Sequence, residues 1–125
     1  MTSQDVLVTV KTRYLKKESR IDKGRLVFSY TITITNNSPQ TVQLLSRHWI
    51  ITDGDTLKNQ EVHGEGVVGQ QPYISPGEHF TYTSGTVMES LVGTMHGSYD
   101  FKDANGELFR AEIPPFTLAA PLKVH

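Results

Sequence analysis

One alternating stretch, residues 25–36, does most to limit the folds open to this chain. Its even positions are apolar and its odd positions carry hydroxyl groups: Leu26, Phe28, Tyr30, Ile32 and Ile34 against Ser29, Thr31, Thr33 and Thr35. Successive side chains of a β-strand point to opposite faces, so this period of two in β-branched and aromatic residues predicts a strand. One face of the strand must be buried under a second apolar layer, which the rest of the chain has to supply.

Further strands are predicted where alternation recurs between turn signals. They are residues 6–14, 41–52, 57–62, 79–84, 94–102 and 107–113, with 116–122 as a short extension after Pro114 and Pro115, which break or kink the ladder. Residues 15–24, 53–55, 85–92 and 103–106 are predicted turns or loops, and no segment has a credible helical pattern. Apolar residues lie on both faces of residues 41–52, which indicates a central strand or a bulge that switches faces.

These strands predict an all-β fold, an immunoglobulin-like or fibronectin type III-like β-sandwich of seven to eight mostly antiparallel strands. A chain of 125 residues with 37% hydrophobic residues suits one domain, residues 1–125, which can bury a core without disulfides. The chain contains no cysteine, so disulfides, thiolate catalysis and cysteine-based zinc sites are excluded.

Charge and hydropathy argue against two classes of partner. The net charge is −1 with both signs scattered, which is unlike the basic surface of a nucleic-acid binder. No apolar run reaches the roughly 18 residues of a transmembrane helix, and the polar residues 1–5 lack the features of a signal peptide. We therefore expect a cytoplasmic protein that binds neither nucleic acid nor a membrane.

The least regular stretch, residues 63–76, contains the candidate binding loop: His63, Gly64, Glu65, Gly66, Val67, Val68, Gly69 and Gln70. Residues 64–69 match the spacing G-x-G-x-x-G, but no helical pattern follows, so a dinucleotide-binding site is disfavoured. Backbone amides in such a loop can still converge on an anion without a helix. The alternative is a structural loop whose glycines adopt positive φ.

Reactive residues lead to no catalytic or metal-binding assignment. The histidines are His48, His63, His79, His96 and His125, and none pairs at His-x-His or His-x-x-x-His spacing. Distant strands could gather some of them with glutamates around a divalent ion: His63, His79 or His96 with Glu65, Glu78 or Glu89. Solvent-facing histidines are the commoner outcome, and no nucleophile elbow is present. We assign no catalytic residue, metal ligand or cofactor, and expect that the protein is not an enzyme.

An ordered series of motifs resembles the ApaG family. The matching runs are residues 47–53 (RHWIITD), 62–72 (VHGEGVVGQQP), 75–78 (SPGE), 82–86 (YTSGT), 93–99 (GTMHGSY) and 113–116 (IPPF). The chain departs from the expected pattern at His63, where an arginine or another basic residue is expected at least as readily. The resemblance implies a fibronectin-type β-sandwich with no established enzymatic activity. It also implies a link to cobalt tolerance and magnesium efflux and, from related eukaryotic domains, a protein-interaction role.

Two functional hypotheses follow, and a third, a hydrolase acting on a phosphate-type substrate, is disfavoured because no metal–carboxylate set or nucleophile is evident. The first is a non-enzymatic binding module whose partner, another protein or a second copy in a homodimer, contacts the candidate loop. Exposure of Val67, Val68 and Tyr73 would support it. The second is a site for a phosphate-type anion, pyrophosphate or a dinucleoside polyphosphate, in residues 64–69. It requires the three glycine amides of that segment to converge on one point.

Overall fold

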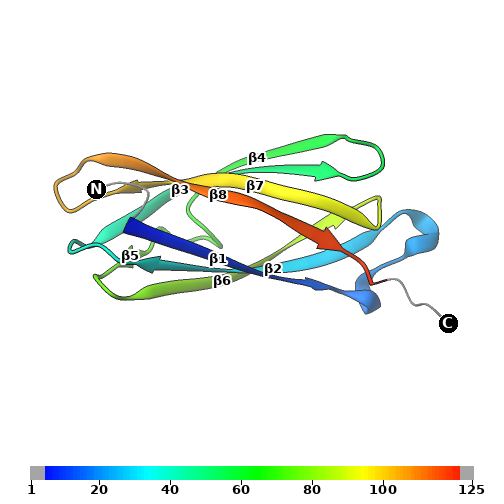
Figure 1. Cartoon of the computed structure of the whole chain (residues 1–125), viewed down its shortest axis with the longest axis horizontal. Helices are drawn as coiled ribbons and strands as arrows, with labels where there is room; N and C mark the ends of the chain where they lie inside the picture. The colour runs from blue at the N-terminus through cyan, green and yellow to red at the C-terminus, as the bar shows by residue number, and fades with distance from the viewer. Residues whose placement is uncertain (1–4, 122–125) are drawn as a thin grey trace.

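Eight β-strands form two antiparallel sheets that pack face to face (Figure 1). The computed structural model describes residues 5–121. One sheet has the strand order β1-β2-β6: β1 (Val6–Tyr14), β2 (Leu26–Asn36) and β6 (His79–Met88). The other has the order β4-β3-β7-β8, with β5 also paired to β3: β3 (Val42–Asp53), β4 (Asn59–Glu65), β5 (Tyr73–Ile74), β7 (Val92–Lys102) and β8 (Leu108–Ala119). The predicted all-β sandwich is therefore confirmed.

The alternation in β2 determines which way that strand faces. Its even residues from Leu26 to Asn36 are all buried, while the odd residues are only partly buried. On the outer face, Thr31 shares a hydroxyl hydrogen bond of 2.8 Å with Thr83 of β6, and Thr33 shares one of 3.1 Å with Thr81. Hydroxyl pairs of this kind are a recognised cross-strand interaction. The predicted division of β2 into an apolar and a hydroxyl-rich face is confirmed.

Aromatic rings from both sheets meet at the centre of the sandwich. Trp49 of β3 is 2% exposed and packs edge-on against Tyr30 of β2, with ring centroids 5.4 Å apart. The same indole contacts Tyr99 of β7 and Phe116 of β8 at centroid distances of 6.2 and 5.8 Å. Such edge-to-face contacts add about 0.5–1.5 kcal/mol each beyond the buried area. Trp49 thus joins the two sheets through one ring.

A bulge in β3 explains why its apolar residues occupy even positions in one part of the strand and odd positions in the other. The pairing of β3 with β7 shifts register between Leu44 and Ser46. Before the shift Val42 and Leu44 are buried, whereas after it Trp49 and Ile51 are buried. One extra residue in a strand reverses which positions face the core. The bulge proposed from the sequence is confirmed, and β3 also has paired neighbours on both sides.

The predicted start of the next strand at residue 57 is wrong, and so is the tight turn at residues 53–55. β3 and β4 are joined by residues 54–58, and β4 begins only at Asn59. The Leu57 N–H donates to Asp53 O, and Leu57 has a φ of 57°, which places it in the left-handed region rather than in a strand. β4 then continues to Glu65, so His63, Gly64 and Glu65 belong to a strand rather than to an irregular loop.

Two further boundaries differ from the prediction. β6 extends to Met88 because its last four residues keep pairing with β2, up to the Leu26–Met88 pair. β8 runs through Pro114 and Pro115, and the β7–β8 register shifts opposite them. Proline is tolerated there because β8 is an outer strand. Position 122 of the predicted last extension lies outside the described residues.

The charged connection between β1 and β2 contains two short 3-10 turns, η2 (Lys16–Glu18) and η3 (Ile21–Lys23). No α-helix occurs between residues 5 and 121, as predicted. Within that range there is also no helix long and apolar enough to span a bilayer.

Candidate functional site

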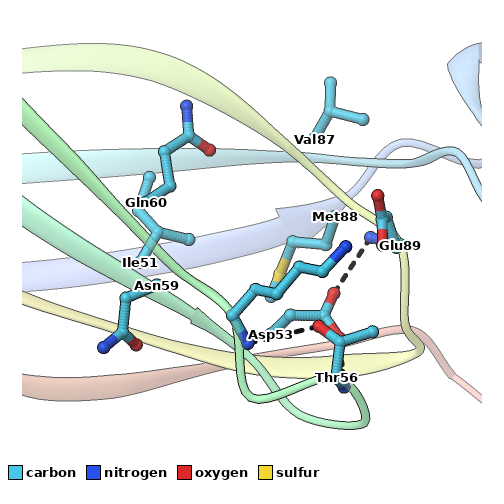
Figure 2. A pocket seen from close by; sticks show the side chains of 9 residues that line it. Ile51, Asp53, Thr56, Asn59, Gln60, Val87, Met88 and Glu89 are labelled. Carbon is cyan, nitrogen blue, oxygen red and sulfur yellow. Dashed lines mark hydrogen bonds between the residues drawn. The ribbon is translucent and has the colours of Figure 1, made fainter.

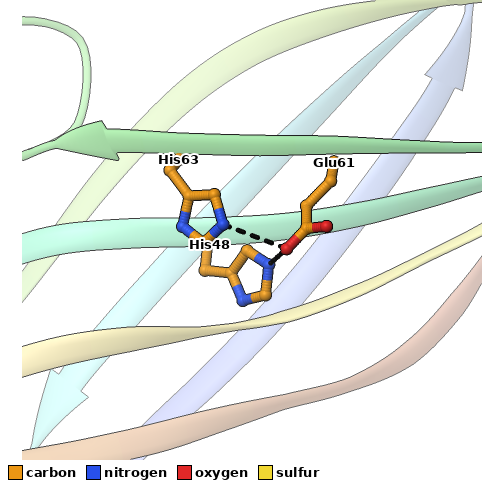
Figure 3. Close-up of side chains that lie close together, drawn as sticks. All are labelled: His48, Glu61 and His63. Carbon is orange, nitrogen blue, oxygen red and sulfur yellow. Dashed lines mark hydrogen bonds and ion pairs between the residues drawn. The ribbon is translucent and has the colours of Figure 1, made fainter.

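The β3–β4 hairpin places two histidines side by side on the outer face of the sandwich (Figure 3). His48 of β3 lies directly opposite His63 of β4, next to the inward-facing pair of Trp49 and Val62. Because strand side chains alternate, both imidazoles point away from the core. Glu61, two residues before His63 on β4, lies on the same face and reaches diagonally across to His48.

One carboxylate oxygen joins the two rings. The Nε2 atom of His48 is 2.7 Å from Oε1 of Glu61, and the Nε2 atom of His63 is 3.0 Å from the same oxygen. The rings are stacked with centroids 4.0 Å apart and an interplanar angle of 6°. The hydrogen bond from His48, and to a smaller extent that from His63, lowers the pKa of the Glu61 carboxyl, so this side chain is a carboxylate at neutral pH.

The sequence pattern does not reveal this cluster. It offers His63 as a metal ligand only together with His79 or His96 and with other glutamates. The structure places His79 on β6, in the other sheet, and His96 on β7, where it pairs with Ile50. His125 lies outside the described residues. A correct register for the hairpin would have revealed the cluster, since in it positions 48 and 63 are partners.

The candidate binding loop divides into a strand end and a tight turn. His63, Gly64 and Glu65 complete β4, and an antiparallel bridge between Val67 and Gln70 closes the turn after Gly66. Val68 and Gly69 occupy the two central positions with φ of 43° and 78°. Two positive φ values at the centre of a two-residue turn are characteristic of type I′. Asn-Gly is the usual pair there, so a β-branched valine at the first position is strained.

The backbone of this turn is already engaged. The Gly66 N–H donates to Leu45 O at 2.7 Å, and the Val67 and Gln70 N–H groups donate to each other's carbonyl oxygens. Gly64 pairs with Arg47 in the β3–β4 ladder. Of the three glycine amides that an anion-binding loop would need, that of Gly66 is therefore already used within the protein.

Arg47 supports the turn from β3. Its Nη1 donates to the carbonyl oxygens of Glu65 and Gly66 at 3.2 and 2.9 Å. A Cβ at Gly64 would lie 2.5 Å from the same Nη1, so a larger residue there would displace the guanidinium from this position. Arg47 is thus a loop-supporting residue rather than a free cation.

Exposure of the three apolar residues named in the first hypothesis is mixed. Val67 is fully buried and anchors the turn in the core. Val68 at the tip of the turn is 56% exposed, and Tyr73 of β5 is 73% exposed. Two of the three are therefore available to a partner.

A cavity of about 240 Å³ lies between the β3–β4 connection and the β6–β7 turn (Figure 2). One of its two acidic residues, Asp53, accepts hydrogen bonds from the Ser90 hydroxyl and from four N–H groups: Asp55, Thr56, Glu89 and Ser90. The Ser90 hydrogen bond is the main reason that the pKa of Asp53 lies far below its ordinary 3.8. The contacts with Glu89 and Ser90 tie the β3–β4 connection to the β6–β7 turn, and those with Asp55 and Thr56 stabilise the β3–β4 connection itself, so Asp53 has a structural role.

None of the described serine hydroxyls is hydrogen-bonded to a histidine; that of Ser90, for example, is bonded to Asp53. Acyl-transfer catalysis by a serine needs such a base within reach. The described residues therefore contain no serine–histidine pair of this kind.

Comparison with known proteins agrees with this fold. Residues 16–103 match the ApaG domain. The chain is 52% identical over 124 residues to the protein ApaG of Pseudomonas paraeruginosa, covering 99% of this chain and 98% of that one. It is 55% identical over 118 residues to the protein ApaG of Ectopseudomonas mendocina, covering 94% and 93%.

Solved structures show the same relationship. The crystal structure of an ApaA protein from Bordetella pertussis superimposes with a TM-score of 0.91 at 46% identity, covering 95% of this chain and 96% of that one. A second X-ray structure has a TM-score of 0.88 at 45% identity, covering 97% and 94%. The chain belongs to the ApaG domain family.

Proposed function

We propose that this protein is a non-enzymatic, cytoplasmic binding module whose protein partner contacts Val68 and Tyr73, two exposed side chains of the segment between β4 and β6. The observation that carries the proposal is the combination of exposure and strain at Val68. A β-branched residue with positive φ costs about 1–3 kcal/mol, and such strain is found most often where a segment has a functional role.

The surface around this turn is held in place before any partner arrives. Val67 is buried, Arg47 supports the carbonyls of the turn, and Gln71 Nε2 donates to Leu45 O at 2.8 Å. The Gln43 side chain donates in turn to Gln71 O at 3.2 Å. A pre-ordered loop loses little conformational entropy on binding, so exposed apolar groups on it contribute more to affinity.

The experiment compares two double variants as immobilised baits in an extract of the source cells. Val68→Ser/Tyr73→Ser removes both apolar groups of the proposed surface. The matched control, Ile21→Ser/Leu108→Ser, removes two apolar side chains that are 60% and 72% exposed elsewhere. We expect a specific protein to be retained by the wild type and the control and lost with the first variant. Equal retention by all three would refute the assignment of this surface.

A homodimer is the second form of the same proposal. Sedimentation of the wild type over a range of concentrations would detect it. If self-association occurs and disappears only in the Val68→Ser/Tyr73→Ser variant, the partner is a second copy of the chain.

The anion-binding alternative ranks below this proposal because the Gly66 and Gln70 amides already donate within the protein. It is tested by an amide NMR titration with pyrophosphate and with diadenosine tetraphosphate. Saturable shifts at Gly64, Gly66 and Gly69 would support an anion site, and unchanged spectra at millimolar concentrations would remove it. The link to cobalt and magnesium homeostasis remains a prediction from family resemblance.

A further inference from the structure

The outer face of the β3–β4 hairpin gathers two imidazoles and one carboxylate (Figure 3). Within residues 5–121, His48, Glu61 and His63 are the one group of at least three such side chains whose ligand atoms all lie within 4.8 Å of one another. We propose that these three residues bind a divalent transition-metal ion, with Zn²⁺ as the reference. This inference goes beyond the proposed protein-binding function and does not depend on the Val68 turn.

The donor set selects the class of ion. Imidazole nitrogen suits zinc, copper and nickel, whereas calcium and magnesium prefer sites made of oxygen ligands alone. Two histidines and a glutamate are also a known ligand combination for Zn²⁺ with an open fourth position. The chemistry therefore points to a late first-row metal rather than to calcium or magnesium.

The distances require only side-chain adjustment. Ligand atoms around a tetrahedral zinc ion at about 2.0–2.1 Å are roughly 3.3 Å apart. The two Nε2 atoms are now 2.7 and 3.0 Å from Oε1 of Glu61. Rotation of the two stacked rings toward a common point, with withdrawal of the carboxylate, would open this space to an ion while the backbone stays in place.

The hairpin backbone fixes the spacing of the three ligands. His48 and His63 are direct cross-strand partners, and the adjacent Trp49–Val62 pair faces the core. Trp49 is 2% exposed, so its burial holds this part of the ladder rigid. Ligands on rigid strands are positioned more accurately than ligands on loops.

The charges around the cluster are balanced. A shallow groove beside it contains two arginines, Arg47 and Arg110, and two acidic residues, Glu65 and Asp100. Arg110 Nε is 3.0 Å from Asp100, and Arg47 is bonded to backbone carbonyls. In the described part of the chain the Glu61 carboxylate is paired with the two imidazoles, and of the two arginines Arg110 is paired with a carboxylate.

A simple exposed ion pair is the competing explanation. The side chains of Glu61 and His63 are 58% and 68% exposed, and ion pairs this exposed contribute little to stability. A weak ion pair explains the convergence of both Nε2 atoms on one oxygen no better than a chance contact between the side chains would. The two explanations differ in a measurable way, since only a metal site gives saturable binding that requires all three side chains.

The test is isothermal titration calorimetry of the untagged full-length protein with ZnCl₂ at pH 7.5. We expect one ion per chain. His48→Gln, Glu61→Gln and His63→Gln should each weaken binding at least about tenfold, because changes in outer-shell partners alone cost 10–100-fold. His79→Gln and His96→Gln are the matched controls and should leave the affinity unchanged.

A second readout separates ligation from a structural effect. In the ¹⁵N spectrum of the imidazoles, Zn²⁺ should shift the Nε2 resonances of His48 and His63 and leave those of His79 and His96 in place. The three variants should keep the wild-type melting temperature without metal, because their side chains lie outside the core. The proposal is overturned if Zn²⁺ binds no more tightly than millimolar. It is overturned equally if binding survives in His48→Gln/His63→Gln or is lost in the control variants.

Discussion

The hydroxyl groups of Tyr82 and Tyr99 share a hydrogen bond inside the sandwich, one from each sheet. Tyr82 belongs to β6 and Tyr99 to β7, and they are 6% and 0% exposed. Each hydroxyl supplies the partner that the other needs in the interior. A buried hydroxyl left without a partner costs about 1–3 kcal/mol, so this pair ties the two sheets together specifically.

Each single replacement should therefore lower the free energy of unfolding by more than half of the loss that the double replacement causes. We expect Tyr82→Phe and Tyr99→Phe each to lower the free energy of unfolding by about 1–3 kcal/mol. The double variant should lose less than the sum, because no orphaned hydroxyl remains. Urea denaturation of the four proteins measures this coupling, and strictly additive losses would show that the hydroxyls do not interact.

Alkaline pH should destabilise the protein through the same two tyrosines. Burial is the main cause that raises the pKa of both phenols above their ordinary 10.0. A phenol that stays protonated in the folded state but ionises in the unfolded state contributes stability below pH 10. That contribution is lost as the pH rises above 10. Absorbance at 295 nm should show part of the five tyrosines ionising only as the fold is lost.

Acid pH should act through Asp53 in the opposite direction. Its folded pKa is depressed, first by the Ser90 hydrogen bond, so its contribution is fully present above the ordinary 3.8 and is lost as the pH falls below that value. Asp53→Asn replaces one acceptor oxygen with a donor and should lower stability at pH 7 by about 2–4 kcal/mol.

Urea midpoints between pH 7 and pH 3 measure this difference for the wild type and Asp53→Asn. The gap between the two proteins should narrow as the pH falls. The control is Asp55→Asn, an exposed neighbour on the same turn, which should behave as the wild type does. A gap that stays constant with pH would mean that the charge of Asp53 does not contribute.

The strained turn should be improved by a residue that tolerates its backbone. Val68→Asn creates the Asn-Gly pair favoured in type I′ turns and should raise stability by about 1 kcal/mol. That corresponds to a rise of about 3–5 °C in the melting temperature for a domain of this size. Val68→Ala keeps the positive φ and should give little or no gain. If Val68 contacts the partner, the stabilised Val68→Asn protein should also bind it more weakly.

Most of the sandwich could be predicted from the sequence because period two is a strong signal in strands that face a core. The β2 pattern and the switch of faces in β3 were both readable in this way. The predicted range of β4 is wrong for two reasons. A mostly exposed edge strand has little hydrophobic alternation, and Leu57 is apolar like a strand residue although it lies in a turn.

The candidate site could not be predicted without the correct position of β4. Whether His48 meets His63 is a question of register, and register follows from the length and geometry of the connection between the strands. The geometry of this turn cannot be predicted from the sequence of residues 54–58, because Leu57 adopts a positive φ without being Gly, Asn or Asp. The contacts of Arg47 could not be predicted either, because they join its side chain to backbone carbonyl groups across the ladder and therefore depend on register.

The five-residue connection from Gly54 to Lys58 therefore has an influence well beyond its own place in the chain. Adding or deleting one residue there would turn Glu61 and His63 toward the interior and carry Val62 out to solvent. By contrast, His48, Glu61 and His63 lie outside the core, so we expect their exchange to alter the outer face and leave the packing of the sandwich intact. Within this architecture the length of a nearby turn constrains the fold more than the identity of these three side chains does.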